Sequence, residues 1–446
     1  MPLVNTPLRR LALAVGAAFL AALVLLTLGG REPSVPVSTP DLGQVRPTSG
    51  GTLGEISRLQ AAVRRAPAAA APRVALAGEY LQRVRETGDV AFYQRAELLL
   101  RGVLAREPRN ADAHVALGGL ALSRHDFAGG LRLARRSQAG LAALPVMVDA
   151  LVELGRYVDA RRALQRLADL KPNLSTYARV SYLRELHGDL GGAASALDLA
   201  AAAGGPAPEN AAAIEVLRGD LALVRGRPGE ARAAYGRALS EAPKYAPAEA
   251  GRARLAAYEA DLAGTHRVST VSHRGPAVRR GLGRTIRLYQ GLVARLPLPE
   301  YAIGLGEAEL AAGRVRAARQ DLALVRVQQR LLARAGVNTD TELAVFESDH
   351  GRPARGLRLA RRAWAAAPSV RSADAVGWAL TRSGRRDAGL RWARRARRLG
   401  SADPLFAFHA GMAARGAERR RLLRFALEHG LGTRPWQALQ AREALR

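Results

Sequence analysis

Histidine and the two acidic residues are the side chains of this sequence that could bind a metal ion or move protons, and their spacing matches no established motif. The eight histidines include no His-Glu-x-x-His pair of the kind that binds zinc on one helix face. His266 and His273 lie seven residues apart, but the surrounding Ser, Thr, Gly and Pro disfavour the helix that would align them. We therefore expect no metal site. His125, His187 and His350 occupy or adjoin predicted turns and are expected to be solvated.

Motifs for nucleotide binding and for nucleophilic catalysis are missing from the sequence. Gly-Leu-Gly occurs three times, but the third glycine of a dinucleotide-binding loop never follows, and no Gly-Lys pair exists for a P-loop. The Gly-x-Ser-x-Gly elbow of serine hydrolases does not occur. The chain has no cysteine, which excludes disulfides and thiolate chemistry. We expect a protein that is not an enzyme, with no cofactor and no small-molecule substrate.

Arginine dominates the charge of the sequence. There are 68 basic and 39 acidic residues, and the formal net charge is +29. Residues 351–446 contain 22 arginines and 6 acidic residues, so this part of the chain should attract anionic partners. The candidate polyanion-binding residues share one predicted helix face: Arg391, Arg394, Arg395 and Arg398. A solvated outer face, or the arginine-rich codon usage of a GC-rich genome, would also explain them.

The first 30 residues predict a signal anchor or a signal peptide. Arg9 and Arg10 precede Leu11–Leu28, an uncharged stretch in which only Thr27 is polar. At about 1.5 Å per residue, this helix is just long enough to cross ~30 Å of hydrocarbon. The arginines would hold the N-terminus in the cytoplasm and place the remainder outside. We favour an anchor in the cell membrane, and the alternative is secretion after signal cleavage.

A regular pattern of helix pairs follows a linker. Residues 31–54 contain four prolines among Ser, Thr and Gly, as a flexible or extended linker does. Beyond them, Gly-Arg recurs at 155, 226, 313, 351 and 384, each time before a predicted helix with a small residue five positions after the glycine. A glycine inside a helix costs about 1 kcal/mol relative to alanine. The recurring small residues therefore indicate places where two helices cross closely.

This pattern resembles the tetratricopeptide repeat (TPR) family, whose 34-residue unit forms two antiparallel helices. Small residues match the family's first helix at Gly118, Gly219, Gly251, Gly306, Ala344 and Gly377, and its second helix at Ala160, Ala231, Ala318, Gly356 and Gly389. The resemblance implies an all-α, right-handed superhelical solenoid of stacked antiparallel helix pairs, preceded by the N-terminal hydrophobic helix. The array would cover residues 55–434, with an irregular insertion at 264–284 and a capping helix at 435–446. A bacterial protein, membrane-anchored or exported, fits these features.

The resemblance also implies a binding groove lined by the first helix of each pair. The register places six partner-binding candidates on or near this face: Tyr182, Glu185, Glu307, Asp349, Trp378 and Arg382. Trp378 could instead be a packing residue. We favour a non-catalytic scaffold that binds an unidentified protein or peptide partner outside the cytoplasmic membrane. The alternative is polyanion binding through the C-terminal arginines, to anionic lipid on a membrane surface, to wall polymer or, less favoured, to nucleic acid.

Overall fold

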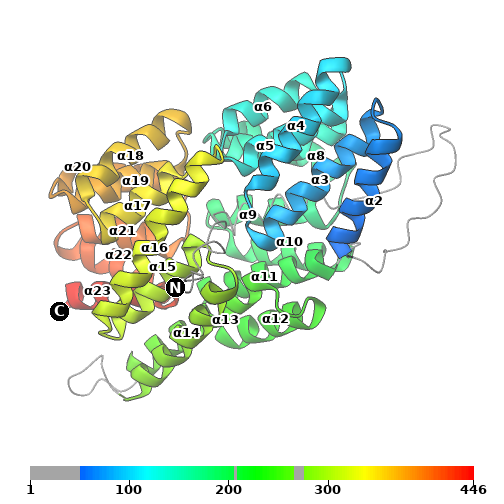
Figure 1. Cartoon of the computed structure of the whole chain (residues 1–446). Helices are drawn as coiled ribbons and strands as arrows, with labels where there is room; N and C mark the ends of the chain where they lie inside the picture. Colours follow the sequence, from blue (N-terminus) through cyan, green and yellow to red (C-terminus); the bar gives the residue numbers. More distant parts are fainter. Residues whose placement is uncertain (1–50, 205–207, 266–275) are drawn as a thin grey trace, which may run out of the picture.

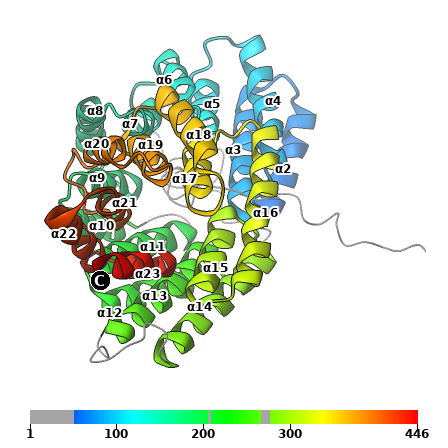
Figure 2. The ribbon, with the colours of Figure 1, turned by 90° about the vertical axis from the view of Figure 1, so that its left-hand side faces the viewer.

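The secondary structure of the described residues is helical throughout. The computed structural model describes residues 51–204, 208–265 and 276–446, and within these ranges the chain forms 22 α-helices, two short 3-10 helices and no strand. Consecutive helices pack against each other as antiparallel pairs, and the pairs follow one another around a ring (Figure 1, Figure 2). The all-α fold predicted from the sequence is confirmed.

The helices follow one another through short turns. Those of the first half are α2 (Gly51–Arg65), α3 (Ala70–Thr87), α4 (Ala91–Arg106), α5 (Ala111–Ser123), α6 (Phe127–Arg136), α7 (Leu144–Glu153), α8 (Tyr157–Leu170), α9 (Leu174–Leu186), α10 (Leu190–Ala203), α11 (Pro208–Val224) and α12 (Pro228–Glu241). Those of the second half are α13 (Ala246–Thr265), α14 (Pro276–Arg295), α15 (Pro299–Ala311), α16 (Val315–Arg334), α17 (Asp340–His350), α18 (Pro353–Ala366), α19 (Val370–Arg382), α20 (Arg386–Ala396), α21 (Pro404–Ala413), α22 (Gly416–Glu428) and α23 (Pro435–Leu445).

The recurring Gly-Arg pairs mark the turn inside a helix pair. Helices α8, α12, α16, α18 and α20 each begin two residues after such a glycine. Gly155, Gly226, Gly313 and Gly384 have φ angles of 70°, 71°, 79° and 80°. This left-handed conformation is one that glycine adopts without steric cost. The glycine thus ends the first helix and lets the second begin where the sequence predicts.

Small residues lie where the two helices of a pair cross. A Cβ added to Gly118 in α5 would lie 3.4 Å from the carbonyl oxygen of Gly130 in α6. A Cβ added to Gly377 in α19 would lie 3.1 Å from that of Gly389 in α20. In α15 and α16, a Cβ on Gly306 would lie 2.6 Å from the Leu322 Cγ atom. Close contact between the helices therefore explains why glycine stands at these mid-helix positions.

Both ends of the insertion expected at 264–284 are helical, and residues 266–275 lie outside the described residues. Helix α13 extends to Thr265 and α14 begins at Pro276, so the stretch predicted as irregular contains the start of a 20-residue helix. Leu282, Ile286 and Tyr289 follow at helical spacing and are buried. The helical spacing of these buried hydrophobic residues favours a helix more strongly than the glycines of this stretch disfavour it.

The predicted linker is shorter than expected at its C-terminal end. Helix α2 begins at Gly51, inside the segment 31–54 that the sequence analysis assigned to the linker. The predicted hydrophobic helix and the rest of the linker fall in residues 1–50, which lie outside the described residues. Among the helices described, none combines the length and the apolar character needed to cross a bilayer.

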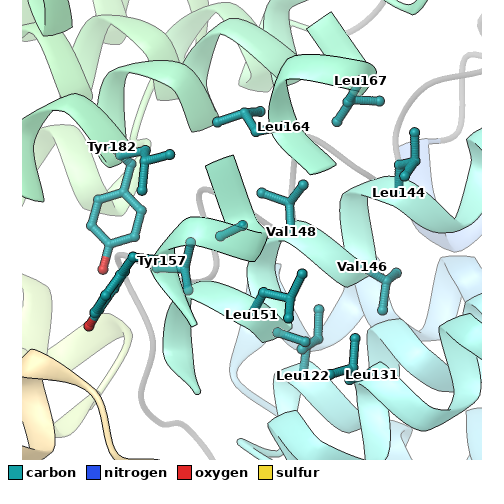
Figure 3. Packing of buried hydrophobic residues seen from close by; sticks show 14 of the residues in the cluster. Leu122, Leu131, Leu144, Val146, Val148, Leu151, Tyr157, Leu164, Leu167 and Tyr182 are labelled. Atoms are coloured by element: carbon teal, nitrogen blue, oxygen red, sulfur yellow. The ribbon is translucent and has the colours of Figure 1, made fainter. Parts of the chain in front are cut away.

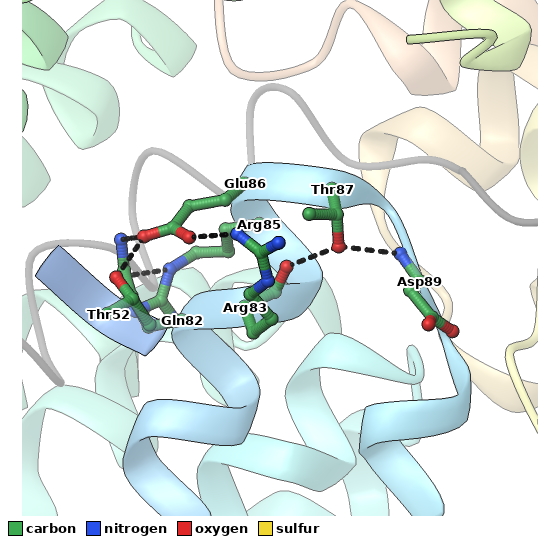
Figure 4. Close-up of polar contacts among 7 residues, drawn as sticks. All are labelled: Thr52, Gln82, Arg83, Arg85, Glu86, Thr87 and Asp89. Carbon is green, nitrogen blue, oxygen red and sulfur yellow. Dashed lines mark hydrogen bonds and ion pairs between the residues drawn. The ribbon is translucent and has the colours of Figure 1, made fainter. Parts of the chain in front are cut away.

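Polar contacts attach the first helix of the array to the next one (Figure 4). Glu86, near the end of α3, accepts a hydrogen bond from the Thr52 hydroxyl of α2 and pairs with Arg83 of its own helix at 3.0 Å. The Thr87 hydroxyl donates to the Arg83 carbonyl oxygen at 2.7 Å and accepts from the Asp89 N–H at 3.2 Å. Thr87 therefore stabilises the end of α3, and the hydrogen bond between Glu86 and Thr52 joins α3 to α2.

Hydrogen bonds connect the second half of the chain to the first half. The His125 Nδ1 atom lies 2.7 Å from the carbonyl oxygen of Asn338. The Val370 N–H donates to the Tyr157 hydroxyl at 2.9 Å. Both contacts join residues that are 213 positions apart. The chain therefore comes back to its own earlier turns after about 200 residues.

The later part of the chain, which packs on these earlier turns, forms a second layer of the array. Two of the turn glycines lie directly against it. A Cβ on Gly155 would overlap the carbonyl oxygen of Pro368, and one on Gly188 would overlap that of Gly400. Both glycines also have positive φ. A side chain at either position would thus disturb the local turn and the contact between the two layers.

The C-terminal end closes the ring against the middle of the chain. Arg442 of α23 forms a two-bond ion pair with Asp261 of α13, with N–O distances of 2.9 and 2.7 Å. A Cβ on Gly430 would lie 2.9 Å from the Leu223 carbonyl oxygen of α11. Helix α23 also packs on α15, and this places the predicted C-terminal helix within the array rather than at a free end.

A shared hydrophobic core accompanies these polar contacts. Figure 3 shows part of a buried cluster that extends from α5 to α9 and includes Leu151 and Leu164. Val370 of α19 and Phe406 of α21 belong to the same cluster and are 1% and 6% exposed. Burying one such side chain stabilises the fold by about 1.5–3 kcal/mol. The two layers are therefore joined by core packing as well as by hydrogen bonds.

We predict that the size of the side chain at position 306 controls stability. Gly306→Leu should destabilise the fold by about 1–3 kcal/mol, because the new side chain would overlap Leu322. Gly236→Ala, in an exposed part of α12 with no atom near its Cβ, should stabilise the chain by up to about 1 kcal/mol. Urea denaturation measures both changes, and equal effects of the two substitutions would contradict the helix crossing.

We further predict that Gly155→Ala destabilises the chain more than Gly384→Ala. Both substitutions place alanine at positive φ, which costs roughly 1–2 kcal/mol. Only the Cβ at position 155 meets another part of the chain. The additional loss of unfolding free energy in Gly155→Ala, relative to Gly384→Ala, therefore measures the contact between the layers. Equal free energies of unfolding for the two variants would show that this contact does not form in solution.

Candidate functional site

Four of the six predicted partner-binding residues come together, three of them buried or half-buried and Arg382 exposed. Glu307 lies on α15, Asp349 on α17, and Trp378 and Arg382 on α19. The Trp378 Nε1–H donates to Asp349 Oδ1 at 2.9 Å, and the Arg382 guanidinium lies 5.5 Å from the centre of the Trp378 ring. The first helices of three successive pairs thus build one cluster, as the predicted register requires.

Trp378 has no exposed surface. Its ring stacks on His409 of α21 with a centroid distance of 4.2 Å and an interplanar angle of 13°. Its relative exposure is 0%. This arrangement is the packing alternative that the sequence left open for Trp378. His409 in turn contacts Asp374 Oδ2 at 2.8 Å; the register of the sequence placed Asp374 on or near the inner face, whereas His409 was not among the residues it placed there.

Glu307 is also buried and is surrounded by polar side chains. The His350 Nε2 atom lies 3.2 Å from Glu307 Oε1, and the Gln437 Nε2–H donates to the same oxygen at 2.7 Å. Burial raises the pKa of Glu307, but hydrogen bonds from His350 and Gln437 and the nearby Arg434 outweigh it and lower the pKa overall.

The expectation that His350 is solvated was wrong. Its side chain is 5% exposed, because the end of α17 faces the interior and reaches Glu307. His125 is likewise buried, at 9% exposure, against Asn338 of the second layer. Only His187 of the three is exposed. The turn at His125, which would face water in an open array, is covered here by a later part of the chain.

Tyr182 and Glu185 lie on α9, and each contacts other residues. The Tyr182 hydroxyl donates to Glu153 Oε1 at 3.4 Å, and its ring is buried. Glu185 is half-buried, and the Ser181 hydroxyl donates to its Oε1 at 3.3 Å. Burial raises the pKa of Glu185 to about 8 against the lowering effect of Ser181.

The four arginines proposed for polyanion binding are all exposed, three on α20 and Arg398 in the turn after it, but they differ in their partners. Arg394 pairs with Glu418 of α22 at 3.0 Å. The Arg395 guanidinium lies 4.9 Å from the ring centre of Trp364, and that of Arg398 lies 5.3 Å from Tyr157. Arg391 is exposed and has no carboxylate partner among the described residues.

Neighbouring helices extend this basic surface. On α18, α20, α22 and the turn after α20, eight exposed arginines form no ion pair with the described residues, and we call them the arginine face: Arg358, Arg361, Arg391, Arg395, Arg398, Arg420, Arg421 and Arg424. Their crowding has an electrostatic effect nearby. Burial lowers the pKa of Arg397, and the positive charge of Arg421 lowers it further. The surface therefore carries uncompensated positive charge.

Two small cavities lie among the described residues. One of about 30 Å³ lies between the layers and is lined by residues that include His125, Glu153 and Arg371. A second, open depression of about 210 Å³ is lined by Glu215, Arg237 and neighbouring residues. Neither holds the volume of several hundred Å³ that drug-sized ligands occupy. For a metal ion, the donor set at Glu307, Asp349 and His350 is suitable, with ligand atoms within 4.8 Å of one another.

Comparison with known proteins gives structural neighbours only. No family model and no curated protein matches the chain. The human IFIT1 dimer with m7Gppp-AAAA is 12% identical over 78% of this chain and 77% of that chain, with a TM-score of 0.42. The P58(IPK) TPR domain is 16% identical (84% and 94% coverage, TM-score 0.25), and the APC/C hetero-tetramer Cut9-Hcn1 is 14% identical (84% and 83%, TM-score 0.30). At these TM-scores the similarity carries no argument about partners.

We predict that Glu185 makes stability depend on pH. Its pKa is about 8 in the fold, with Asp220 and Asp403 nearby, and about 4.3 in an unfolded chain, so ionisation opposes folding. The stabilising effect of Glu185→Gln relative to the wild type should therefore grow between about pH 5 and pH 9. Urea denaturation at pH 5, 7 and 9 tests this, with the exposed Glu428→Gln as the charge-matched control. Identical pH profiles for Glu185→Gln and Glu428→Gln would contradict it.

Proposed function

We propose that this chain is a non-catalytic TPR-type scaffold, with the right-handed superhelix of that family, which docks on an anionic membrane surface through its arginine face. The observation that supports docking is the set of eight exposed arginines without carboxylate partners on α18, α20, α22 and the turn after α20. Each arginine near an anionic bilayer contributes about 1 kcal/mol to binding. A surface of this kind attracts anionic lipid without requiring a shaped pocket.

The interior of the ring supports peptide binding less well. Tyr182, Glu307 and Trp378 are buried, at 8%, 4% and 0% exposure, and each already has partners within the chain. A peptide in this groove would have to displace those contacts. We therefore place the partner on the outer surface, where the arginines are free to exchange water for anionic groups.

The sequence suggests how the chain reaches a membrane. Leu11–Leu28 would anchor it, and the proline-rich segment would hold the helical array near the outer surface of the same bilayer. An anchored array needs only weak affinity per arginine, because the anchor raises the local concentration of the face at the lipid surface. A protein released by signal cleavage would bind the same surface with the arginines alone.

Vesicle sedimentation tests this proposal. The fragment 51–446 should bind vesicles that contain phosphatidylglycerol and should not bind pure phosphatidylcholine vesicles. Replacing Arg391, Arg398, Arg420 and Arg424 by Gln should lower the partition coefficient at least tenfold, because four charges near the lipid are lost. Raising the salt from about 50 to 500 mM should weaken wild-type binding, since the Debye length falls well below 10 Å.

A charge-matched variant is the control for the vesicle experiment. Arg64 and Arg65 of α2 and Arg284 and Arg287 of α14 are exposed, without ion pairs among the described residues, and lie on other sides of the ring (Figure 1, Figure 2). Replacing these four by Gln removes the same net charge and should leave vesicle binding close to that of the wild type. Equal loss in the two quadruple variants would show that net charge, and not the arginine face, governs binding.

A further inference from the structure

Two tryptophans lie beneath an arginine of the arginine face. Trp364 of α18 and Trp392 of α20 contact each other edge to face, with ring centroids 4.8 Å apart and an interplanar angle of 82°. The Arg395 guanidinium lies over both rings, 4.9 Å from the centre of Trp364 and 5.4 Å from that of Trp392. We call Trp364 and Trp392 the tryptophan pair, and this contact places the pair within the arginine face.

The tryptophan pair is packed on the core but is not enclosed by it. Both residues are half-buried and pack against the hydrophobic cluster of α15 to α19. A Cβ added to Gly377 of α19 would lie 3.2 Å from the Trp392 Cβ atom, which places the base of this side chain at the crossing of α19 and α20. The core therefore holds the two side chains in place while part of each remains exposed to solvent.

The indole N–H groups of the pair are available for hydrogen bonding. Neither the Trp364 Nε1–H nor the Trp392 Nε1–H has an acceptor among the described residues, whereas the Nε1–H of the buried Trp378 donates to Asp349. A large apolar ring that carries one polar N–H suits the boundary between lipid headgroups and acyl chains, and tryptophan is enriched at that depth of a bilayer. The pair therefore has the chemistry of a side chain at a membrane interface.

Exposed arginines accompany the tryptophan pair along both helices. Arg361 lies one helical turn before Trp364, and Arg391 lies one turn before Arg395. None of these three arginines forms an ion pair with a described residue. At an anionic bilayer, guanidinium groups bind lipid phosphates at headgroup depth, and apolar groups between them can reach the acyl chains. The arrangement of charge and aromatic surface thus matches the two layers of a lipid interface.

We propose that the tryptophan pair inserts into the interface of the anionic bilayer that the arginine face binds. This inference rests on the proposed function, because the arginines bring the pair to the lipid. Burial of the exposed indole surface stabilises the bound state through apolar contact, which salt does not screen as it screens the arginine charges. Insertion also fixes α18 and α20 against the bilayer, and thereby the orientation of the array on the membrane.

Quenching of tryptophan fluorescence by brominated lipid tests the insertion with the full-length chain. All four tryptophans lie beyond residue 50, so the emission comes from the helical array alone: Trp364, Trp378, Trp392 and Trp436. In vesicles that contain phosphatidylglycerol, lipids brominated on their acyl chains should quench this emission, and in pure phosphatidylcholine vesicles they should not. A Trp364→Phe, Trp392→Phe double variant should lose most of the quenching, because phenylalanine keeps an apolar ring but not the indole emission. Trp436→Phe, which removes a half-buried tryptophan of α23, should retain it.

A second measurement on the wild type separates this inference from the proposed function. Lipid with a dansyl group on its headgroup accepts energy from tryptophan over a longer distance than bromine quenches, so it reports docking with or without insertion. If phosphatidylglycerol raises the energy transfer but brominated lipid does not quench, the arginines dock the array and the insertion is overturned, whether or not the double variant folds.

Two further outcomes also contradict the inference. Equal quenching in the wild type and in the Trp364→Phe, Trp392→Phe variant would show that another tryptophan reaches the lipid. If phosphatidylglycerol raises neither the energy transfer nor the quenching, the proposed docking fails, and insertion of the tryptophan pair fails with it.

Discussion

The contact between successive layers of the ring determines most of what is distinctive about this structure. A helix-pair array can remain open, with its inner face exposed to water along the whole length. Here the turn at Gly155 touches the chain at Pro368, and the Tyr157 hydroxyl accepts a hydrogen bond from Val370. Both contacts use backbone atoms, so they require close approach and not only suitable side chains. Glycine at the turn makes that approach possible.

Contacts between neighbouring helix pairs determine which inner residues are available for binding. Residues of successive first helices contact one another, as Trp378 does with His409 and Asp349, and Trp378 is thereby fully buried. Polar side chains that are buried in this way need partners, because an unsatisfied buried group costs free energy. The interior is therefore rich in ion pairs and hydrogen bonds, such as the buried pair of Arg179 and Asp149 at 2.8 Å. Uncompensated charge remains on the outer helices.

The helix pairs were predictable because their signals are local, whereas the closure and the interior cluster were not. A glycine at positive φ and a small residue at a helix crossing depend only on residues of the same helix pair. Their spacing in the sequence therefore indicates where each helix begins. The contacts of His125 and Tyr157 join residues 213 positions apart and involve backbone groups of ordinary sequence. His350 was interpreted as a turn residue because its contact with Glu307, on the preceding helix pair, gives no signal in the local sequence. Nothing in the sequence indicated that Gln437 is buried, since a glutamine in a terminal helix is usually solvated.

Cross-linking between the two layers is the most direct test of closure, and the absence of native cysteine makes it practical. His187 and Arg398 both lie beside the Tyr157 ring, at 6.4 and 5.3 Å, although they belong to different layers. A His187→Cys, Arg398→Cys double variant should be joined within one chain by a short bis-maleimide in native buffer, and this product should disappear in urea. A His187→Cys, Arg64→Cys pair should give no such product. Failure of the first pair to react under native conditions would show that the array is open and would contradict the ring.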